Sequence, residues 1–205
     1  MAFTDNFGHP KGLIGRMMLV SMDKEHLPMA EWAMERFDLP ENGDMIDLGC
    51  GGGYNIQRFL KRGFQGKVVG FDISEESVKK AKAVNKAELG SRVEIVQGTV
   101  ENIPFQDESF HLATAFETVF FWPDVKKNIQ EVFRVLKPGG RFVVINNYGD
   151  PNTDWEKKVP CMKRYTAEQI AGFMKSAGFE DPRIEKKDNL FLVEGKKIGR
   201  EHRRP

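Results

Sequence analysis

Cysteine is scarce in this chain of 205 residues, which contains only Cys50 and Cys161. Two cysteines cannot build a disulfide framework, and neither has the CxxC spacing of a metal site. The chain also lacks a run of about eighteen apolar residues and the basic-then-apolar start of a signal peptide. These absences exclude a disulfide scaffold and a membrane-spanning helix. They predict a cytoplasmic protein with no membrane partner and no bound metal.

A surplus of either charge is missing too. Lys and Arg total 31 against 30 Asp and Glu, which gives a formal net charge of +1. Without a basic surplus there is no global attraction for a polyanion, so we expect no nucleic-acid partner. Internal repeats and low-complexity segments are also absent, and the length fits one α/β domain rather than two. We expect this domain to be a monomer or a homodimer.

Short apolar, β-branched runs alternate with helical segments from residue 45 onward, which is typical of βαβ units. The runs predict strands at Met45–Leu48, Lys67–Asp72, Val93–Gln97, Phe110–Ala115 and Arg141–Asn146. Two more runs, at 179–185 and 189–193, predict an antiparallel hairpin around a polar turn at 186–188. The predicted fold class is therefore α/β: a doubly wound, seven-stranded sheet, mostly parallel, with an antiparallel C-terminal hairpin and helices on both faces.

The chain divides into three predicted segments. Residues 1–42 show no strand pattern, but Met29, Trp32, Ala33 and Phe37 stand at helical spacing, which predicts an N-terminal helical cap. This cap could cover an edge of the domain or form a lid over a ligand cleft. Residues 43–195 form the predicted Rossmann-like domain, and residues 196–205 a basic, solvated C-terminal tail.

Two helices carry clear start and stop signals. Asp124 is placed as the N-cap of a helix whose apolar face contains Ile129, Val132, Phe133 and Leu136, and residues 137–140 (KPGG) are expected to end it. Thr166 and Gln169 have the spacing of a capping box, and Gly178 follows as the C-terminal stop. These signals fix two helices of the predicted sheet-and-helix alternation.

A glycine-rich turn follows the first predicted strand and opens a helix, in the stretch Asp47-Leu48-Gly49-Cys50-Gly51-Gly52-Gly53. Glycines allow the chain to turn tightly and approach a ligand at the carboxyl end of that strand. Asp72 ends the second strand about twenty residues further on, where a carboxylate can accept both ribose hydroxyls. The pattern therefore predicts a nucleotide site at this edge of the sheet.

Two kinds of nucleotide cofactor are bound by such a turn. A dinucleotide site has the pattern G-x-G-x-x-G, but counting from Gly49 the last position is Tyr54. The pattern D-x-G-x-G-x-G fits fully, and the acid at its head suits a cationic amino group and a sulfonium, whereas it would repel a pyrophosphate. A sulfonium nucleotide is favoured, and a nicotinamide-dependent oxidoreductase is the disfavoured alternative.

This segment resembles motif I of the class I (Rossmann-like) S-adenosylmethionine-dependent methyltransferases. Three further segments resemble later motifs of the family in the same order, at residues 96–105, 110–116 and 131–142. The similarity covers residues 43–147 and is strongest to the small-molecule branch that includes the ubiquinone and sterol methyltransferases. It implies S-adenosyl-L-methionine as cofactor, S-adenosyl-L-homocysteine as product, and in-line transfer of a methyl group to a small-molecule acceptor.

The resemblance also implies which residues bind the cofactor. They are Asp47, Gly49, Cys50, Gly51, Gly53, Asp72, Ile73, Thr99, Val100, Glu101 and Phe116. Thr99 stands where the family usually has an aspartate in the loop that holds the adenine. A threonine can still form a hydrogen bond there, but the carboxylate contact to the adenine amine does not carry over.

Residues after the fourth and fifth strands, at the same edge, are candidates to meet the acceptor: Phe121, Trp122, Asn146 and Asn147. Aromatic side chains beside a carboxylate could hold a cationic amine or surround a flat apolar ring. His26, Glu117 and Tyr148 are the candidate general bases. Cys161, in the later connection, could line the pocket or only anchor its loop.

Two alternatives stay open at the level of sequence. A non-catalytic protein of the same fold, acting as a regulator or scaffold, would bind S-adenosylmethionine without turnover. A nucleic-acid methyltransferase is disfavoured because the N/D-P-P-Y type of loop is missing after the fourth strand, where residues 116–119 (FETV) stand. That absence leaves RNA carbon or ribose methylation open, and the sequence does not determine which atom is methylated.

Overall fold

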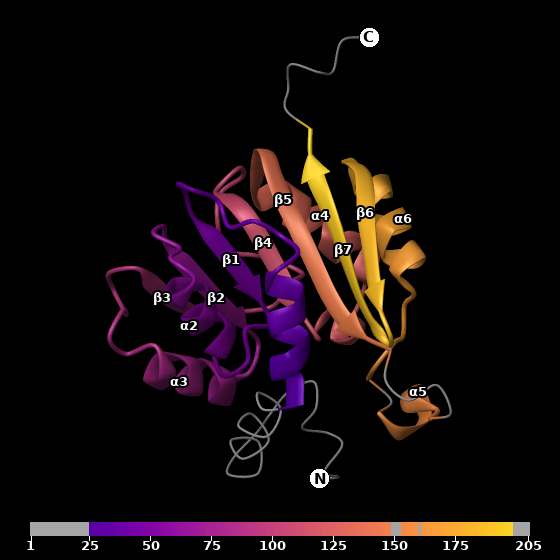
Figure 1. Ribbon diagram of the computed structural model, residues 1–205, viewed down its shortest axis with the longest axis horizontal. Helices are drawn as coiled ribbons and strands as arrows, with labels where there is room; N and C mark the ends of the chain where they lie inside the picture. Colours follow the sequence, from indigo (N-terminus) through magenta and orange to yellow (C-terminus); the bar gives the residue numbers. More distant parts are fainter. Residues whose placement is uncertain (1–24, 149–152, 160, 199–205) are drawn as a thin grey trace.

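A single seven-stranded sheet runs through the molecule (Figure 1), whose computed structural model describes residues 25–148, 153–159 and 161–198. The strands are β1 (Met45–Leu48), β2 (Val68–Asp72), β3 (Val93–Gln97), β4 (Phe110–Phe116), β5 (Leu136–Asn147), β6 (Phe179–Lys187) and β7 (Leu190–Lys197). Their order is β3-β2-β1-β4-β5-β7-β6. The pairs among β1 to β5 are parallel, and β7 is antiparallel to β5 and β6. The predicted mixed, doubly wound sheet is confirmed.

The start of β5 differs from the prediction. Helix α4 ends at Val135, and Leu136, which was expected on its apolar face, begins the strand. Phe110 pairs with Leu136, and Leu112 pairs next with Arg141, so residues 137–140 (KPGG) form an irregularity inside β5 rather than a linker before it. The helix therefore ends just before the predicted turn, and the turn residues belong to the strand.

The helices are α2 (Tyr54–Lys61), α3 (Glu75–Val84), α4 (Val125–Val135), α5 (Trp155–Lys158) and α6 (Ala167–Ala177), with a 3₁₀ turn at Val119–Phe121. The predicted caps are confirmed. The Asp124 carboxylate accepts from the Lys127 amide at 3.2 Å, and Thr166 and Gln169 cap each other's backbone amides at 3.2 and 2.8 Å. Gly178 ends α6 with a φ of 106°.

Helices cover both faces of the sheet (Figure 1). The apolar faces of α4 and α6 pack on one side, in a core that contains Ile129 and Ile170. On the other side α2 and α3 pack together with a helical segment at 25–34. Met29 and Trp32 of this segment lie in that second core, so the described part of the predicted cap covers a face of the sheet. Residues 1–24 of the predicted cap lie outside the described residues.

The boundary of the predicted C-terminal tail moves by two residues. Strand β7 continues to Lys197, whose ammonium is buried and donates to the carbonyl oxygens of Phe133 at 2.8 Å and Leu136 at 2.6 Å. These carbonyls close the end of α4, where a cation is favourable for the helix dipole. Residues 196–197 therefore belong to the domain. In the part of the chain that the structure describes, no helix is long and apolar enough to cross a membrane.

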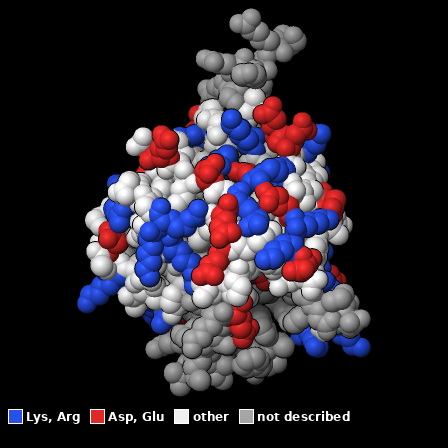
Figure 2. Space-filling view, viewed as in Figure 1, with Lys and Arg blue, Asp and Glu red and all other residues white. Residues whose placement is uncertain are grey.

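Figure 2 shows positive and negative side chains side by side over the viewed face of the molecule. Among the ion pairs of the described residues, Glu194 pairs with Arg141 at 2.8 Å and with Arg183 at 2.6 Å. Arg36, which follows the helical segment 25–34, pairs with Glu185 at 3.4 Å. Each exposed ion pair adds little stability alone, but together these pairs connect the N-terminal segment to β5, β6 and β7.

The capping box of α6 gives a test of how the helix is held. We expect Thr166→Ala to lower the free energy of unfolding by about 1 kcal/mol, because the Gln169 amide loses its acceptor. Ser176→Ala is the matched control on the same helix, since its hydroxyl only bonds back to the Gly172 carbonyl. Urea unfolding of both variants measures the difference, and equal effects of the two substitutions would contradict the assignment.

Candidate active site

A cavity of about 380 Å³ opens at the carboxyl ends of β1 to β4. Its wall residues come from the segments that follow these strands and from one later connection. They are Gly49, Phe71, Asp72, Ile73, Gly98, Thr99, Val100, Glu101, Thr118, Phe121, Trp122, Pro123 and Cys161. This is the edge at which open α/β sheets bind ligands.

The glycine turn takes a conformation that requires glycine. Gly49 has a φ of +71°, and a Cβ there would lie 2.2 Å from the Thr118 hydroxyl oxygen. Gly53 has a φ of +75° and begins α2, and a Cβ on it would collide with Asn85 and Ala81 of the neighbouring helix. The alternate glycines of the motif therefore allow both the turn itself and the close packing of β1, α2 and α3.

The turn is fastened to β2 by its own amides. The amides of Gly49 and Cys50 donate to the Phe71 carbonyl at 2.7 and 3.1 Å. The Gly51 amide donates to the Asp72 carboxylate at 2.9 Å. These donors are thus used inside the protein, and the turn is preformed rather than waiting for a ligand.

Asp72 is the acid that sequence analysis placed beside a ribose, and it does lie in the cavity wall. One carboxylate oxygen accepts from Gly51 and the other from the Ser74 amide at 2.8 Å. Each carboxylate oxygen can accept more than one hydrogen bond, so these two amides do not exhaust the acceptor capacity of the carboxylate. The arrangement fits a vicinal diol, which is the group that a ribose presents.

Asp47, at the head of the motif, lies beneath the turn. Its carboxyl group is 2% exposed and accepts from the Thr114 hydroxyl at 2.7 Å. Burial, with a smaller contribution from the charge of Asp72, raises the pKa of Asp47 to about 7. Burial also raises the pKa of the Cys50 thiol, which packs below the turn against Gly70. Neither residue is part of the cavity wall.

The loop after β3 forms the wall opposite the turn. Its first amide, on Gly98, donates to the Asp72 carbonyl at 3.0 Å, and the Thr99 hydroxyl donates to Glu101 at 3.1 Å. Ile73, with 48% of its surface exposed, is the exposed large hydrophobic side chain of the described residues and lies in the same wall. The predicted positions 73 and 99–101 therefore meet around one space.

Aromatic side chains after β4 form the third wall. Phe121 is partly exposed and faces the cavity. Trp122 also reaches it, but the indole is 4% exposed and stacks on Phe142 with a centroid separation of 6.2 Å. Phe116 is buried and packs beside Phe59, 6.2 Å between centroids, so it supports the site from the core.

Glu117 follows β4 in a strained backbone conformation, with a φ of +54°. Its carboxylate accepts from the Asn147 amide and lies 3.9 Å from the imidazole Nε2 of His26. Burial raises the pKa of Glu117 to about 8. The structure therefore brings together two of the three candidate bases, which are 91 residues apart in the chain (117 minus 26).

Neither Glu117 nor His26 is one of the wall residues, although Thr118 beside Glu117 is. Gly51 and Gly53 of the turn and three further candidates also lie outside the wall. Asn146 is buried within β5 opposite Phe191, and Asn147 contributes its backbone amide to Glu117. The Tyr148 hydroxyl accepts from the Ala167 amide at 3.0 Å and so holds the start of α6. Asn146 and Asn147 are the last residues of β5, and Tyr148 follows them. Strand register and the packing of α6 keep these residues out of the cavity wall.

Four residues that line the cavity were not among the candidates predicted from the sequence: Phe71, Gly98, Thr118 and Pro123. Each is a direct neighbour of a residue that was predicted, so chain continuity was the available signal. Cys161, for which two positions were considered, lies in the wall. Its place depends on how the connection after β5 returns, and no motif marks that path.

A doubly wound sheet with a glycine turn after β1 and an acid at the end of β2 defines a Rossmann-like nucleotide-binding protein. Comparison with known proteins narrows this class, because residues 46–144 match the methyltransferase domain family. The chain belongs to the S-adenosylmethionine-dependent methyltransferases, and its cofactor is S-adenosyl-L-methionine.

Relatives agree with this family. The methyltransferase YdaC of Bacillus subtilis is 28% identical over 82% of this chain and 88% of its own length. A demethylmenaquinone methyltransferase of Lactococcus lactis is 34% identical over 63% of this chain and 52% of its own length. Among solved structures, an S-adenosyl-L-methionine-dependent methyltransferase of Methanococcus maripaludis superposes with a TM-score of 0.71 at 26% identity, covering 92% of this chain and 94% of that one.

The buried Asp47 predicts a pH dependence of stability. Its pKa is about 4 in the unfolded chain and about 7 in the folded one, so the folded state is favoured at low pH and loses stability as pH rises toward 7. Asp47→Asn removes this loss. Relative to the native chain, the variant should gain up to a few kcal/mol of unfolding free energy between pH 5 and pH 8.

Denaturant unfolding at the two pH values measures that gain. Asp181→Asn is the control, since Asp181 is an exposed acid that pairs with Lys175 at the surface. A stability difference between Asp47→Asn and the native chain that is the same at both pH values would show that Asp47 does not titrate in this range.

Proposed function

We propose that this methyltransferase transfers the methyl group of S-adenosylmethionine to a small-molecule acceptor held against the aromatic wall of the cavity. The observation that carries this proposal is the division of one cavity into two sides. One side consists of Asp72 and the loop 98–101, and the other of residues 121–123 after β4. The demethylmenaquinone methyltransferase among the relatives acts on a small molecule, which supports the same class of acceptor here.

The residues present fit an adenosyl cofactor. Asp72 would supply the acceptor pair for ribose hydroxyls, and the loop 99–101 with Ile73 would supply an apolar slot with hydrogen-bonding groups for the base. The buried Asp47 would offset the positive charge of the cofactor's amino group and sulfonium from beneath the turn. When bound, S-adenosylmethionine supplies a methyl group on a sulfonium sulfur, which is already activated for transfer.

The chain's own task is then to position the acceptor, exclude water and take a proton where the acceptor has one to lose. His26 is the more exposed member of the pair, with 36% of its side chain accessible against 13% for Glu117. We propose that His26 receives the proton at Nε2 and that the Glu117 carboxylate offsets the resulting charge. The helical segment 25–34 would thus serve the site as well as the core.

Cofactor binding is tested by calorimetry with S-adenosyl-L-homocysteine. We expect binding to the native chain, and we expect Asp72→Asn to weaken it about ten-fold or more, which corresponds to about 1.4 kcal/mol. Glu75→Gln is the matched control, because Glu75 is a nearby acid that is paired with Lys79 on the surface of α3. Unchanged affinity in a folded Asp72→Asn variant would remove Asp72 from the site.

Turnover is tested with a panel of quinols, phenols, thiols and amines, with release of S-adenosyl-L-homocysteine as the readout. Methylation of a member of this panel is the expected result. Binding of the cofactor with no turnover on any member would instead favour the non-catalytic alternative.

The pair His26 and Glu117 predicts a pH profile for the acceptor found in that panel. Because the pKa of Glu117 is raised to about 8, its carboxylate is protonated below that pH and ionised above it. We expect kcat to rise as pH passes through about 8. In Glu117→Gln this rise should vanish, and His26→Asn should lower kcat by roughly 10²-fold or more with little change in cofactor affinity. A rise that persists in Glu117→Gln would refute the assigned role.

A further inference from the structure

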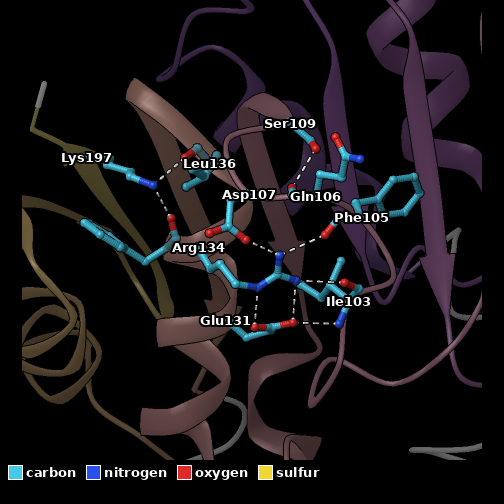
Figure 3. A network of polar contacts seen from close by, with 10 residues as sticks. Ile103, Phe105, Gln106, Asp107, Ser109, Glu131, Arg134, Leu136 and Lys197 are labelled. Atoms are coloured by element: carbon cyan, nitrogen blue, oxygen red, sulfur yellow. Dashed lines mark hydrogen bonds and ion pairs between the residues drawn. The ribbon is translucent and has the colours of Figure 1, made fainter. Parts of the chain in front are cut away.

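Two charged residues of α4 hold the loop that follows β3 (Figure 3). The Arg134 guanidinium donates to the carbonyl oxygens of Ile103 at 2.9 Å and Phe105 at 2.8 Å, and to the Asp107 carboxylate at 2.8 Å. The Glu131 carboxylate accepts from the Ile103 amide at 2.9 Å. Loop backbone is thus bound through both its donors and its acceptors by side chains one helical turn apart.

The two side chains are also paired with each other. Arg134 donates through Nε and Nη2 to the two oxygens of Glu131 at 2.8 and 2.7 Å, which is the bidentate geometry that favours arginine over lysine. This pairing raises the pKa of Arg134 and lowers the pKa of Glu131, so both remain charged at neutral pH. The unit is therefore a fixed clamp on the loop; we call it the Arg134–Glu131 clamp.

The clamped loop is the one that forms the cavity wall. Thr99, Val100 and Glu101 precede Ile103 by only two to four residues. The other end of the loop is fixed where the Gly98 amide donates to the Asp72 carbonyl at 3.0 Å. Between these two anchors the chain closes a turn in which the Asn102 amide donates to the Thr99 carbonyl at 3.0 Å. The wall is thus held at both ends, and one end depends on the clamp.

The same helix begins at the opposite wall. Trp122 and Pro123 line the cavity directly before Asp124, the N-cap of α4. Helix α4 therefore carries one wall at its start and holds the facing wall through Glu131 and Arg134 at its later turns. Because a helix is a rigid rod on this scale, the clamp connects the positions of the two walls.

We propose that Arg134 and Glu131 are positioning residues for the adenosyl half of the cofactor, acting through residues 99–101 on the loop that they hold. The inference rests on the proposed placement of the adenosyl group between this loop and Asp72. It goes beyond that placement by assigning cofactor affinity to two residues that lie outside the cavity wall.

The experiment compares affinity with stability in Arg134→Met. Calorimetry should show S-adenosyl-L-homocysteine and free adenosine weakened by the same factor, at least ten-fold, because adenosine contains the half that the loop contacts. Lys197→Met is the matched control: Lys197 also binds carbonyl oxygens at the end of α4, those of Phe133 and of Leu136 just beyond it, but it lies on β7 and not on the loop that an adenosyl group would use. The affinity of Lys197→Met for both ligands should stay within about two-fold of the native value, even if its melting temperature falls as far as that of Arg134→Met.

Three results would overturn the inference. A folded Arg134→Met variant could bind both ligands as the native chain does, it could lose affinity for the homocysteine-bearing ligand only, or Lys197→Met could lose as much affinity. Should Arg134→Met fail to fold, Arg134→Lys and Glu131→Gln keep the charge or shape of one partner and should show an intermediate loss. Failure of the native chain to bind S-adenosyl-L-homocysteine would instead refute the proposed site itself.

Discussion

The fold and the site both depend on the carboxylate of Asp72. It ends β2, accepts the Gly51 amide of the glycine turn and the Ser74 amide that leads into α3, and it also faces the cavity. Without this acceptor a partly buried amide of the turn would lose its partner, and leaving such a group unpaired costs more than the net gain of forming the bond. The turn is consequently shaped before any ligand arrives, and binding does not have to supply the energy of ordering it.

Two other carboxyl groups near the same edge, the buried Asp47 and the largely buried Glu117, are removed from water at a cost. Burial is the main cause that raises the pKa of each toward or above neutrality, which shows how unfavourable their ionised forms are in this environment. A buried acid with a raised pKa is weak evidence for structural benefit, since an apolar side chain of similar size would pack without the penalty. A cationic ligand above the turn, and His26 beside Glu117, are the partners that would make the charged forms favourable.

The sequence was sufficient for the elements whose signals are local. The caps at Asp124 and Thr166 form as expected, because each depends on neighbours within four residues, and strands β1 and β3 have the bounds that their apolar runs predicted. The predicted bounds were wrong where pairing with a distant strand decides where an element begins or ends. The KPGG segment joins β5 because Phe110 pairs with Leu136. Tyr148, a candidate base, lies outside the cavity wall, and its hydroxyl meets the start of α6. The hairpin turn also moved, since Lys187 pairs with Leu190 and leaves Asp188, with a φ of +52°, in the turn.

The same distinction explains why the cofactor could be identified from sequence and the acceptor could not. The side that we propose for the adenosyl group is built from residues at or just after the ends of paired strands, so sheet register fixes Gly49, Asp72 and Thr99 relative to one another. The side that we propose for the acceptor is built from segments with no strand partner, residues 121–123 and Cys161. The proposed base His26 likewise lies outside the sheet, on a helix that meets Glu117. Such segments can change their side chains without disturbing the sheet. A methyltransferase of this architecture can therefore acquire a new acceptor while its cofactor motif remains recognisable.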